Sequence, residues 1–373
     1  MTTLLAASSL AAWLVLLLFR DRFWRADQRL GDHDPGAFPA VLAIVPARNE
    51  AATVDAALAS LLAQDYPGRL DVVLVDDGSR DATAAIARGL AAEAPPGRRL
   101  RVVTAPPPPA GWSGKVAAQA AGLAAAEAPA PWLWLTDADI VHARHVLRRL
   151  TGEARAHAVS LVSVMVDLRI ANRVERWLVP PFVLFFQLLY PFRAVNDPGR
   201  PIAAAAGGSI LIERAALADA GGFAAIRDRS IDDVALAAAV KGSGRAIRLV
   251  LDHGSASLRG YDLAAFWRMV TRTAFVELDH SYGRLVMALA GLALLFVAPL
   301  ALLAAPAPAS WLAAAASTLG LVAVLPMLRW YGLHPLWALA FPPAAWAYMA
   351  MTLHAALDHA RGRRQRWRGR EIG

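Results

Sequence analysis

Two stretches decide the fold of this chain: Val41-Leu-Ala-Ile-Val-Pro-Ala-Arg-Asn-Glu50 and Leu70-Asp-Val-Val-Leu-Val-Asp-Asp-Gly-Ser79. Each begins with a short, mainly apolar run, interrupted in the second stretch only by Asp71, and then turns polar. Continuous apolar strands are typical of a parallel sheet covered on both faces, because neither side of such a strand meets water. Ligands of these sheets bind beyond the carboxyl ends of the strands. The polar residues after each run are therefore the first candidates for a functional site.

The same texture continues along the chain. Two more apolar runs of this kind are Leu100–Val103 and Trp132–Leu135. Segments with helical patterns separate the four runs, at Ala51–Gln64, Ala82–Ala94 and Val116–Glu127. Alternation of short strands with helices predicts an α/β domain with a mostly parallel sheet, and we place it at residues 40–265.

Composition indicates a membrane protein. Apolar residues make up 57% and charged residues 18% of the 373, against about 45–50% and about 25% in soluble domains. Segments long enough to cross a bilayer need about 20 apolar residues. Charge-free stretches of about that length are Thr2–Phe19, Leu285–Ala305, Ala309–Leu328 and Leu336–Leu353. They predict an N-terminal anchor in residues 1–25 and three transmembrane segments in residues 285–357.

The basic residues bear on the orientation. Arg20–Arg25 follow the first apolar stretch, the reverse of the order in a cleaved signal peptide, which predicts a cytoplasmic location for these arginines. Three further crossings would then put the basic tail, residues 361–373, outside, against the positive-inside rule. Either the last segment, with Pro342-Pro343, is re-entrant, or the tail is an exception.

Other features narrow the class. Trp177–Phe192 is a 16-residue apolar stretch broken by Pro180-Pro181. Its length and aromatic content favour a helix in the membrane interface, with a buried core helix as the alternative. The net charge of +8 arises from arginine clusters beside membrane segments, which argues for contact with phospholipid and against nucleic acid. Without cysteine, the chain has no disulfide framework and no cysteine nucleophile.

Acidic residues follow three of the apolar runs: Glu50, the pair Asp76-Asp77, and the Asp-x-Asp of Asp137 and Asp139. At one edge of a sheet these carboxylates would repel one another unless a cation or hydrogen-bonding ligand compensated them. Asp-x-Asp suits Mg²⁺ or Mn²⁺, which proteins hold through one or two carboxylates together with substrate phosphates. The Asp76-Asp77 pair could instead accept hydrogen bonds from a base or ribose.

Two later features complete the candidate site. Lys115, one of two lysines in the chain, lies near the start of a helix in Gly111-Trp-Ser-Gly-Lys115, which suits contact with a phosphate. Asp232-Asp233 head the helical stretch Val234–Val240. They are either partners of the helix dipole or a general base facing an acceptor hydroxyl.

In order and spacing these motifs resemble those of the family 2 glycosyltransferases, which have the GT-A nucleotide-diphospho-sugar transferase fold. The motifs are Val45-Pro-Ala-Arg-Asn-Glu50, Val75-Asp-Asp-Gly-Ser79, Gly114-Lys115, Asp137-Ala-Asp139, Gly221-Gly222-Phe223 and Asp232-Asp233. Details such as Tyr190-Pro-Phe-Arg-Ala-Val-Asn-Asp197 are similar to a narrower group, the hopene-associated glycosyltransferases of hopanoid-producing bacteria.

The resemblance implies a role for each candidate. The nucleotide would be bound by Pro46, Ala47, Glu50, Asp76 and Asp77, and the diphosphate by Lys115 and Arg272. The metal would be held by Asp137 and Asp139, with Asp233 as the base beside Asp232, where the family has Glu. Processive members carry Gln-x-x-Arg-Trp; here Met269-Val-Thr-Arg-Thr273 keeps only the arginine, which argues against polymer synthesis.

The implied reaction is an inverting, metal-assisted transfer of a sugar from a UDP-sugar to a lipid acceptor at the bacterial cytoplasmic membrane. A hopanoid or another lipid alcohol fits as the acceptor. Two other interpretations stay open on the residues alone: a metal-dependent nucleotidyl- or phosphotransferase, and a non-catalytic membrane scaffold.

Overall fold

The computed structural model describes residues 1–363, 366–367 and 370–371. The basic tail predicted at 361–373 thus lies partly outside the described residues. The chain forms two compact units. One contains residues 28–169, 194–259 and 366–373, and the other contains residues 1–27, 170–193 and 260–365. We call them the sheet unit and the apolar unit.

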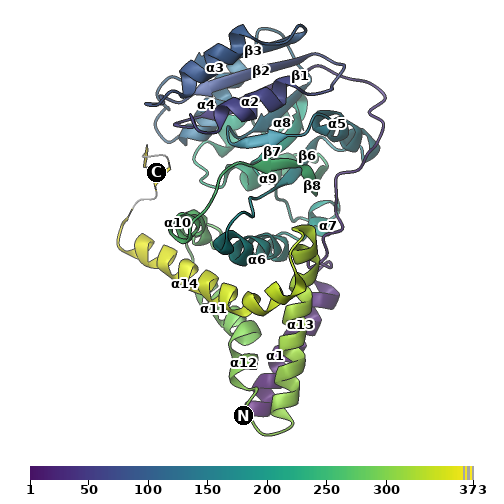
Figure 1. Cartoon of the computed structure of the whole chain (residues 1–373), viewed down its shortest axis with the longest axis vertical. Helices are drawn as coiled ribbons and strands as arrows, with labels where there is room; N and C mark the ends of the chain where they lie inside the picture. Colours follow the sequence, from purple (N-terminus) through teal and green to yellow (C-terminus); the bar gives the residue numbers. More distant parts are fainter. Residues whose placement is uncertain (364–365, 368–369, 372–373) are drawn as a thin grey trace. The chain divides into compact units, whose positions relative to one another are not determined.

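An eight-stranded sheet, in the order β3-β2-β1-β4-β7-β6-β8-β5, forms the centre of the sheet unit (Figure 1). Neighbours β1–β2, β2–β3, β1–β4 and β6–β8 are parallel, whereas β4–β7, β6–β7 and β5–β8 are antiparallel. The mostly parallel sheet expected from the sequence is confirmed. Its strands are β1 (Val41–Ala47), β2 (Leu70–Asp76), β3 (Arg98–Thr104), β4 (Trp132–Thr136), β5 (Ile140–His142), β6 (Leu161–Asp167), β7 (Ser209–Glu213) and β8 (Ile247–Ser257).

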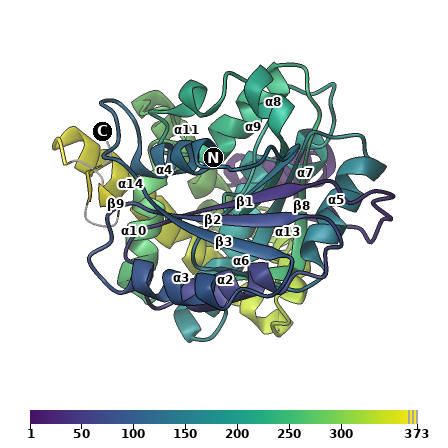
Figure 2. The same cartoon turned by 90° about the horizontal axis from the view of Figure 1, so that it is seen from above.

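Helices cover both faces of this sheet, as the apolar strands predict. Every residue of β1 is buried. Its residues Val41, Ala43 and Val45 pack in one cluster with α2, α3 and α5, and α4 lies against the opposite face, where Gly122 approaches Ile44. Figure 2 shows α2 and α3 on one side of the sheet and α4 on the other. The helices of the unit are α2 (Val54–Leu62), α3 (Thr83–Ala92), α4 (Gly114–Ala124), α5 (Val146–Ala156), α8 (Arg214–Asp219), η1 (Phe223–Ile226) and α9 (Asp232–Gly242).

The apolar unit is helical. Its elements are α1 (Thr2–Phe19), α6 (Arg173–Leu189), α10 (Leu263–Ala274), α11 (Tyr282–Phe296), α12 (Ala298–Ala301), α13 (Ala309–Trp330), η2 (Pro335–Ala340) and α14 (Phe341–Ala360). The short α7 (Phe192–Val195) joins the two units, and β9 (Arg366–Trp367) pairs with β10 (Arg370–Glu371) near the C-terminus. Among the described residues, three helical segments are long and apolar enough to cross a membrane: Thr2–Phe19, Ala309–Trp330 and Pro335–Ala360.

The stretch Leu285–Ala305, which the sequence predicts to be one transmembrane segment, is not a single helix in the structure. The α11 helix has 15 residues and α12 has 4, with a break at Val297 followed by Pro299. Proline lacks the N–H that would continue the helical hydrogen bonds, which accounts for a break at this point. The stretch Trp177–Phe192 falls mainly on α6, which belongs to the apolar unit.

The close packing of α4 on the sheet gives a first prediction. A Cβ atom at Gly122 would lie 2.6 Å from Ile44 Cγ2 and 2.9 Å from Val75 Cγ2. We expect Gly122→Ala to lower the free energy of unfolding, because overpacking costs about 1–3 kcal/mol and the helix-propensity gain is at most about 1 kcal/mol. The measurement is thermal unfolding in detergent. Gly89→Ala in α3, where nothing lies within 4 Å, is the control, and equal stability of the two variants would contradict this packing.

Candidate active site

Parallel pairing brings the predicted polar residues to one edge of the sheet. Ala47, the last residue of β1, pairs with Asp76, the last residue of β2. On the other side of β1, β4 is parallel to it, and Ile44 pairs with Leu135. The carboxyl end of β4, which Asp137 follows, is therefore at the same edge as the carboxyl ends of β1 and β2. Pro46 and Ala47 are the two final residues of β1 and are buried. The carboxylates that follow these strands therefore share one edge, as expected from the sequence.

The first charged group at this edge joins β1 to β2. Asp76 and Asp77 are buried, with exposed fractions of 7% and 3%. The Asp76 Oδ1 atom accepts the backbone N–H of Ser79 at 3.1 Å. The Arg48 Nη1 atom lies 3.6 Å from Asp77 Oδ2 and donates to the Asp77 carbonyl. A guanidinium thus compensates one of the two carboxylates, which can stay charged in a buried place.

A second group, centred on Arg259, joins β1 to the loop after β4. The Arg259 Nε atom lies 2.8 Å from Asp139 Oδ2, and its Nη2 atom lies 3.0 Å from Glu50 Oε1. Arg259 follows β8, so this contact ties a late part of the chain to the first strand. One guanidinium therefore fixes two of the carboxylates predicted from the sequence.

Lys115 is the centre of the third group. It lies in the first turn of α4, whose N-cap Ser113 accepts the N–H of Val116. The Lys115 Nζ atom lies 2.9 Å from Asp137 Oδ1 and 3.5 Å from Asp232 Oδ2. Burial alone would lower the pKa of Lys115, but the nearby carboxylates of Asp137, Asp232 and Asp233 outweigh it and raise that pKa. The ammonium group is therefore held in its charged form.

Asp233 lies beside this lysine at the start of α9. Its carboxylate accepts the backbone N–H of Gly207 at 2.7 Å and that of Val234 at 2.8 Å. Burial, and then repulsion by Asp232, raise the pKa of Asp233 to about 7, although Lys115 and the two N–H groups oppose the change. A carboxyl group with this pKa is suited to take up and release a proton near neutral pH.

The space between Asp233 and Gly207 is narrow. A Cβ atom there would lie 3.1 Å from Asp233 Oδ2 and 3.1 Å from Lys115 Nζ. Below the site, the Thr136 hydroxyl donates to the Gly208 carbonyl at 2.8 Å and contacts His142 at 2.9 Å. Burial lowers the pKa of His142 to about 3, so the ring is neutral and links the hydroxyls of Thr136 and Ser255.

Most of the predicted site residues meet in these three groups. The exception is Arg272, which lies on α10 in the apolar unit. The sequence did not predict three contacts in the site: those of Arg48 with Asp77, of Arg259 with Glu50 and Asp139, and of the Gly207 N–H with Asp233. Arg48 lies inside the motif Val45-Pro-Ala-Arg-Asn-Glu50, but 36 of the 38 basic residues are arginine. Arg259 therefore carried no signal that distinguished it from the other arginines.

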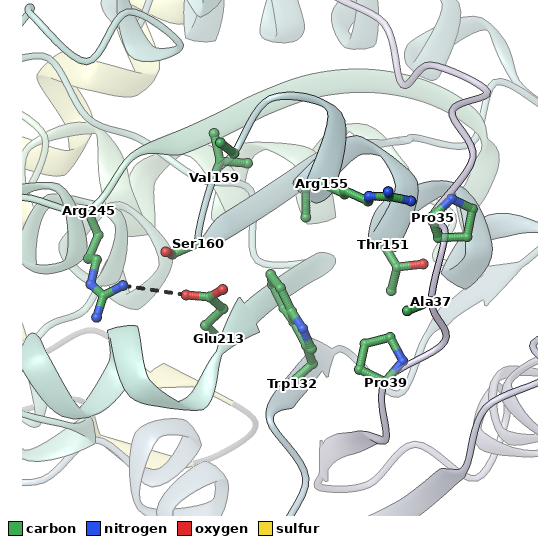
Figure 3. A pocket seen from close by; sticks show the side chains of 12 residues that line it. Pro35, Ala37, Pro39, Trp132, Thr151, Arg155, Val159, Ser160, Glu213 and Arg245 are labelled. Atoms are coloured by element: carbon green, nitrogen blue, oxygen red, sulfur yellow. Dashed lines mark ion pairs between the residues drawn. The ribbon is translucent and has the colours of Figure 1, made fainter.

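A cavity in the sheet unit lies away from these groups. Figure 3 shows it lined by Pro35, Pro39 and Trp132, with the Glu213–Arg245 ion pair at its margin. Trp132 is the first residue of β4, whereas Asp137 follows the last. The cavity is thus at the amino end of that strand, where ligands of such sheets do not normally bind.

Comparison with known proteins agrees with this arrangement. The sequence pattern of Glycosyl transferase family 2 matches residues 42–221. Over 151 residues the chain is 34% identical to an N-acetylglucosaminyltransferase of Mesorhizobium japonicum, covering 40% of this chain and 33% of that protein. A second N-acetylglucosaminyltransferase, from Neorhizobium galegae, is 52% identical over 52 residues, which cover 14% of this chain and 12% of that protein. The chain thus spans about a third or less of the length of these relatives.

A solved structure is similar over nearly the whole chain. It is the mannosyltransferase PcManGT from Pyrobaculum calidifontis in complex with GDP-Man and Mn²⁺. The TM-score is 0.60 at 23% identity, and the similarity covers 96% of this chain and 99% of that one. At this level of identity the likeness establishes the fold, and with the family match it confirms the predicted GT-A fold.

The role of Lys115 as countercharge gives a second prediction. We expect Lys115→Met to lower the midpoint of thermal unfolding. Removing one partner of a buried ion pair costs about 3–5 kcal/mol, a figure that the partial exposure of Asp137 reduces.

The loss should shrink as the pH falls below about 7. The raised pKa of Asp233 means that the folded protein binds that proton more tightly than the unfolded chain. Ionised Asp233 therefore weakens the fold as the pH rises, and it does so more when Lys115 is missing. The measurement is the unfolding midpoint at pH 5 and pH 8 for both proteins; a difference that is the same at both values would contradict the interaction.

Proposed function

We propose that the protein is an inverting glycosyltransferase that moves a hexose from a nucleotide diphospho-sugar to the hydroxyl group of a membrane lipid. The observation that carries the proposal is the arrangement of Lys115 among Asp137, Asp232 and Asp233. It sets a fixed cation and a carboxyl group of near-neutral pKa side by side at the ligand-binding edge of a GT-A sheet. A UDP-sugar is the donor that the motifs favour.

The carboxylates fit a divalent cation, Mg²⁺ or Mn²⁺. Their oxygens are the hard ligands that these ions prefer. Each carboxylate of the Asp-x-Asp already has a positively charged side chain beside it, Lys115 at Asp137 and Arg259 at Asp139. We assign Asp137 and Asp139 to the metal. When bound, such an ion neutralises the charge that develops on the departing diphosphate. PcManGT, the similar structure, is a complex with Mn²⁺.

The remaining site residues have roles toward the donor and the acceptor. Asp76 and Asp77, at the end of β2, would accept hydrogen bonds from the nucleoside, next to Pro46, Ala47 and Glu50. Lys115 would contact the diphosphate, since its ammonium group is a compact point charge near a helix N-terminus. We retain Arg272 as a second diphosphate contact on the resemblance alone.

Asp233 is the proposed general base, with Asp232 beside it. It takes the proton of the acceptor hydroxyl while the oxygen attacks the anomeric carbon. The bond between that carbon and the diphosphate breaks, and the nucleoside diphosphate leaves with the electron pair. The backbone N–H groups of Gly207 and Val234 orient the carboxylate, and the repulsion from Asp232 raises its affinity for the proton.

The acceptor follows from the apolar unit. Three helical segments suited to crossing a bilayer belong to the same chain as the site, which favours an acceptor held in the membrane. We place the protein in the bacterial cytoplasmic membrane with the sheet unit in the cytoplasm, where nucleotide sugars are available. A hopanoid is the lipid alcohol that the narrower sequence resemblance suggests.

Replacing the base gives the third prediction. We expect Asp233→Asn to lower kcat by about 10²–10⁴-fold, the range that general bases contribute, while binding of UDP with Mn²⁺ is kept. Asp139→Asn should weaken that binding as well. The measurements are sugar transfer and calorimetric titration with UDP. Asp228→Asn, an exposed aspartate in the same region, is the control, and equal turnover by Asp233→Asn would exclude this residue as the base.

The pH dependence gives the fourth prediction. Since the base must be deprotonated, kcat/KM should rise with pH on an acid limb near pH 7, the pKa of Asp233. Asp232→Asn removes the repulsion that helps to raise this pKa, so the limb should move to lower pH. An acid limb that stays in place or moves upward in Asp232→Asn would show that another group titrates.

A further inference from the structure

The helices α1 and α13 run side by side in the same direction. Ala6 near the start of α1 clusters with Ala309 and Ala313 at the start of α13. Farther along, a Cβ atom at Gly320 would lie 3.0 Å from the indole of Trp13. Figure 1 shows the two helices lying alongside each other. If both cross the bilayer, they therefore enter it from the same side.

The α11–α12 pair runs in the opposite direction. The Trp13 indole N–H donates to the Leu295 carbonyl at 3.1 Å, and Leu302, just after α12, clusters with Ala6. The chain thus passes from the level of Trp13 to the level of Ala6 between residues 295 and 302. Together α11 and α12 return the chain to the end where α1 and α13 begin.

Arginines gather at the other end of these three helices. Arg20, Arg22 and Arg25 follow α1, Arg284 lies at the start of α11, and Arg329 lies at the end of α13. The turn 302–308, at the opposite end, has no charged residue. The positive-inside rule therefore puts the arginine end in the cytoplasm.

The sheet unit is connected to the chain at this arginine end. The chain leaves the apolar unit after Asp27 and again after Arg193. These two residues form an ion pair at 2.6 Å. Asp27 is close in sequence to Arg20, and Arg193 is close to Leu188, whose carbonyl accepts from Arg20 at 3.1 Å. The connections alone thus assign the sheet unit to the side of the arginines.

The last apolar helix, α14, does not reach the uncharged end. The Phe341 ring packs on Phe296 at 4.9 Å between centroids, and the Trp346 indole donates to the Phe296 carbonyl at 3.3 Å. At the other end of α14, Ala355 clusters with Leu285 near the start of α11. The helix therefore runs from the end of α11 back to its beginning, and Figure 1 shows it oblique to α1 and α13.

We propose that α14 is re-entrant and that the chain crosses the bilayer three times, through α1, α11–α12 and α13. The inference rests on the membrane location in the proposed function. The chain leaves α13 at the arginine end, descends to the level of Phe296 and returns by Ala355. The basic tail that begins at Arg361 is then on the same side as Arg20 and the sheet unit. There the exposed Arg361 and Arg363 face the anionic headgroups of the cytoplasmic leaflet.

The absence of cysteine from the sequence makes a direct test possible. Three single-cysteine variants are labelled with a membrane-impermeant maleimide in spheroplasts, before and after the membrane is opened with detergent. The variants are Arg361→Cys at the end of α14, Ala304→Cys in the uncharged turn, and Ala92→Cys on the surface of the sheet unit, all at exposed positions.

We expect Ala304→Cys to react in intact spheroplasts, and Arg361→Cys and Ala92→Cys only after detergent is added. If Arg361→Cys reacts together with Ala304→Cys, α14 crosses the bilayer and the proposal is wrong. Labelling of both Ala92→Cys and Arg361→Cys from outside would overturn the cytoplasmic placement in the proposed function, but it would support the shared side of the tail and the sheet unit.

Discussion

Repulsion among carboxylates at one edge of the sheet is the constraint on which the rest of the site depends. Parallel strands end at the same edge, so Asp76, Asp77 and the Asp137 loop are forced together by the fold. Among the side chains described above, three basic residues, Arg48, Arg259 and Lys115, form ion pairs with five of the seven carboxylates. The edge keeps an excess of negative charge, which suits it to a metal-bound diphosphate better than to a bare anion.

The same constraint separates two kinds of chemistry within a short distance. Asp137 and Asp139 have direct basic partners, Lys115 and Arg259. Asp233 is held by backbone N–H groups and repelled by Asp232, and its pKa is raised to about 7. A site commonly provides both a charge stabiliser and a base by placing its carboxyl groups in different environments.

The sequence predicted the strands of the sheet and the acidic residues that follow them, because the local apolar pattern of these strands matches their buried position in the fold. Val41–Val45 and Leu70–Val75 are apolar on both sides because both faces of the sheet are covered, and the acidic residues follow directly. Arg259 could not be predicted, because it follows β8 and contacts Asp139 from a position 120 residues later in the chain. Hydropathy also could not show that α14 turns back, since its path is set by packing of Phe341 on Phe296.

The central claim is sugar transfer from a nucleotide diphospho-sugar to a membrane lipid. The most direct measurement uses the purified protein, a membrane lipid extract, Mn²⁺ and UDP-sugar labelled in both the sugar and the nucleotide. The account predicts one labelled glycolipid and an equal amount of UDP. Release of UMP, with the sugar phosphate transferred to the lipid, would contradict it and would identify a phosphotransferase instead.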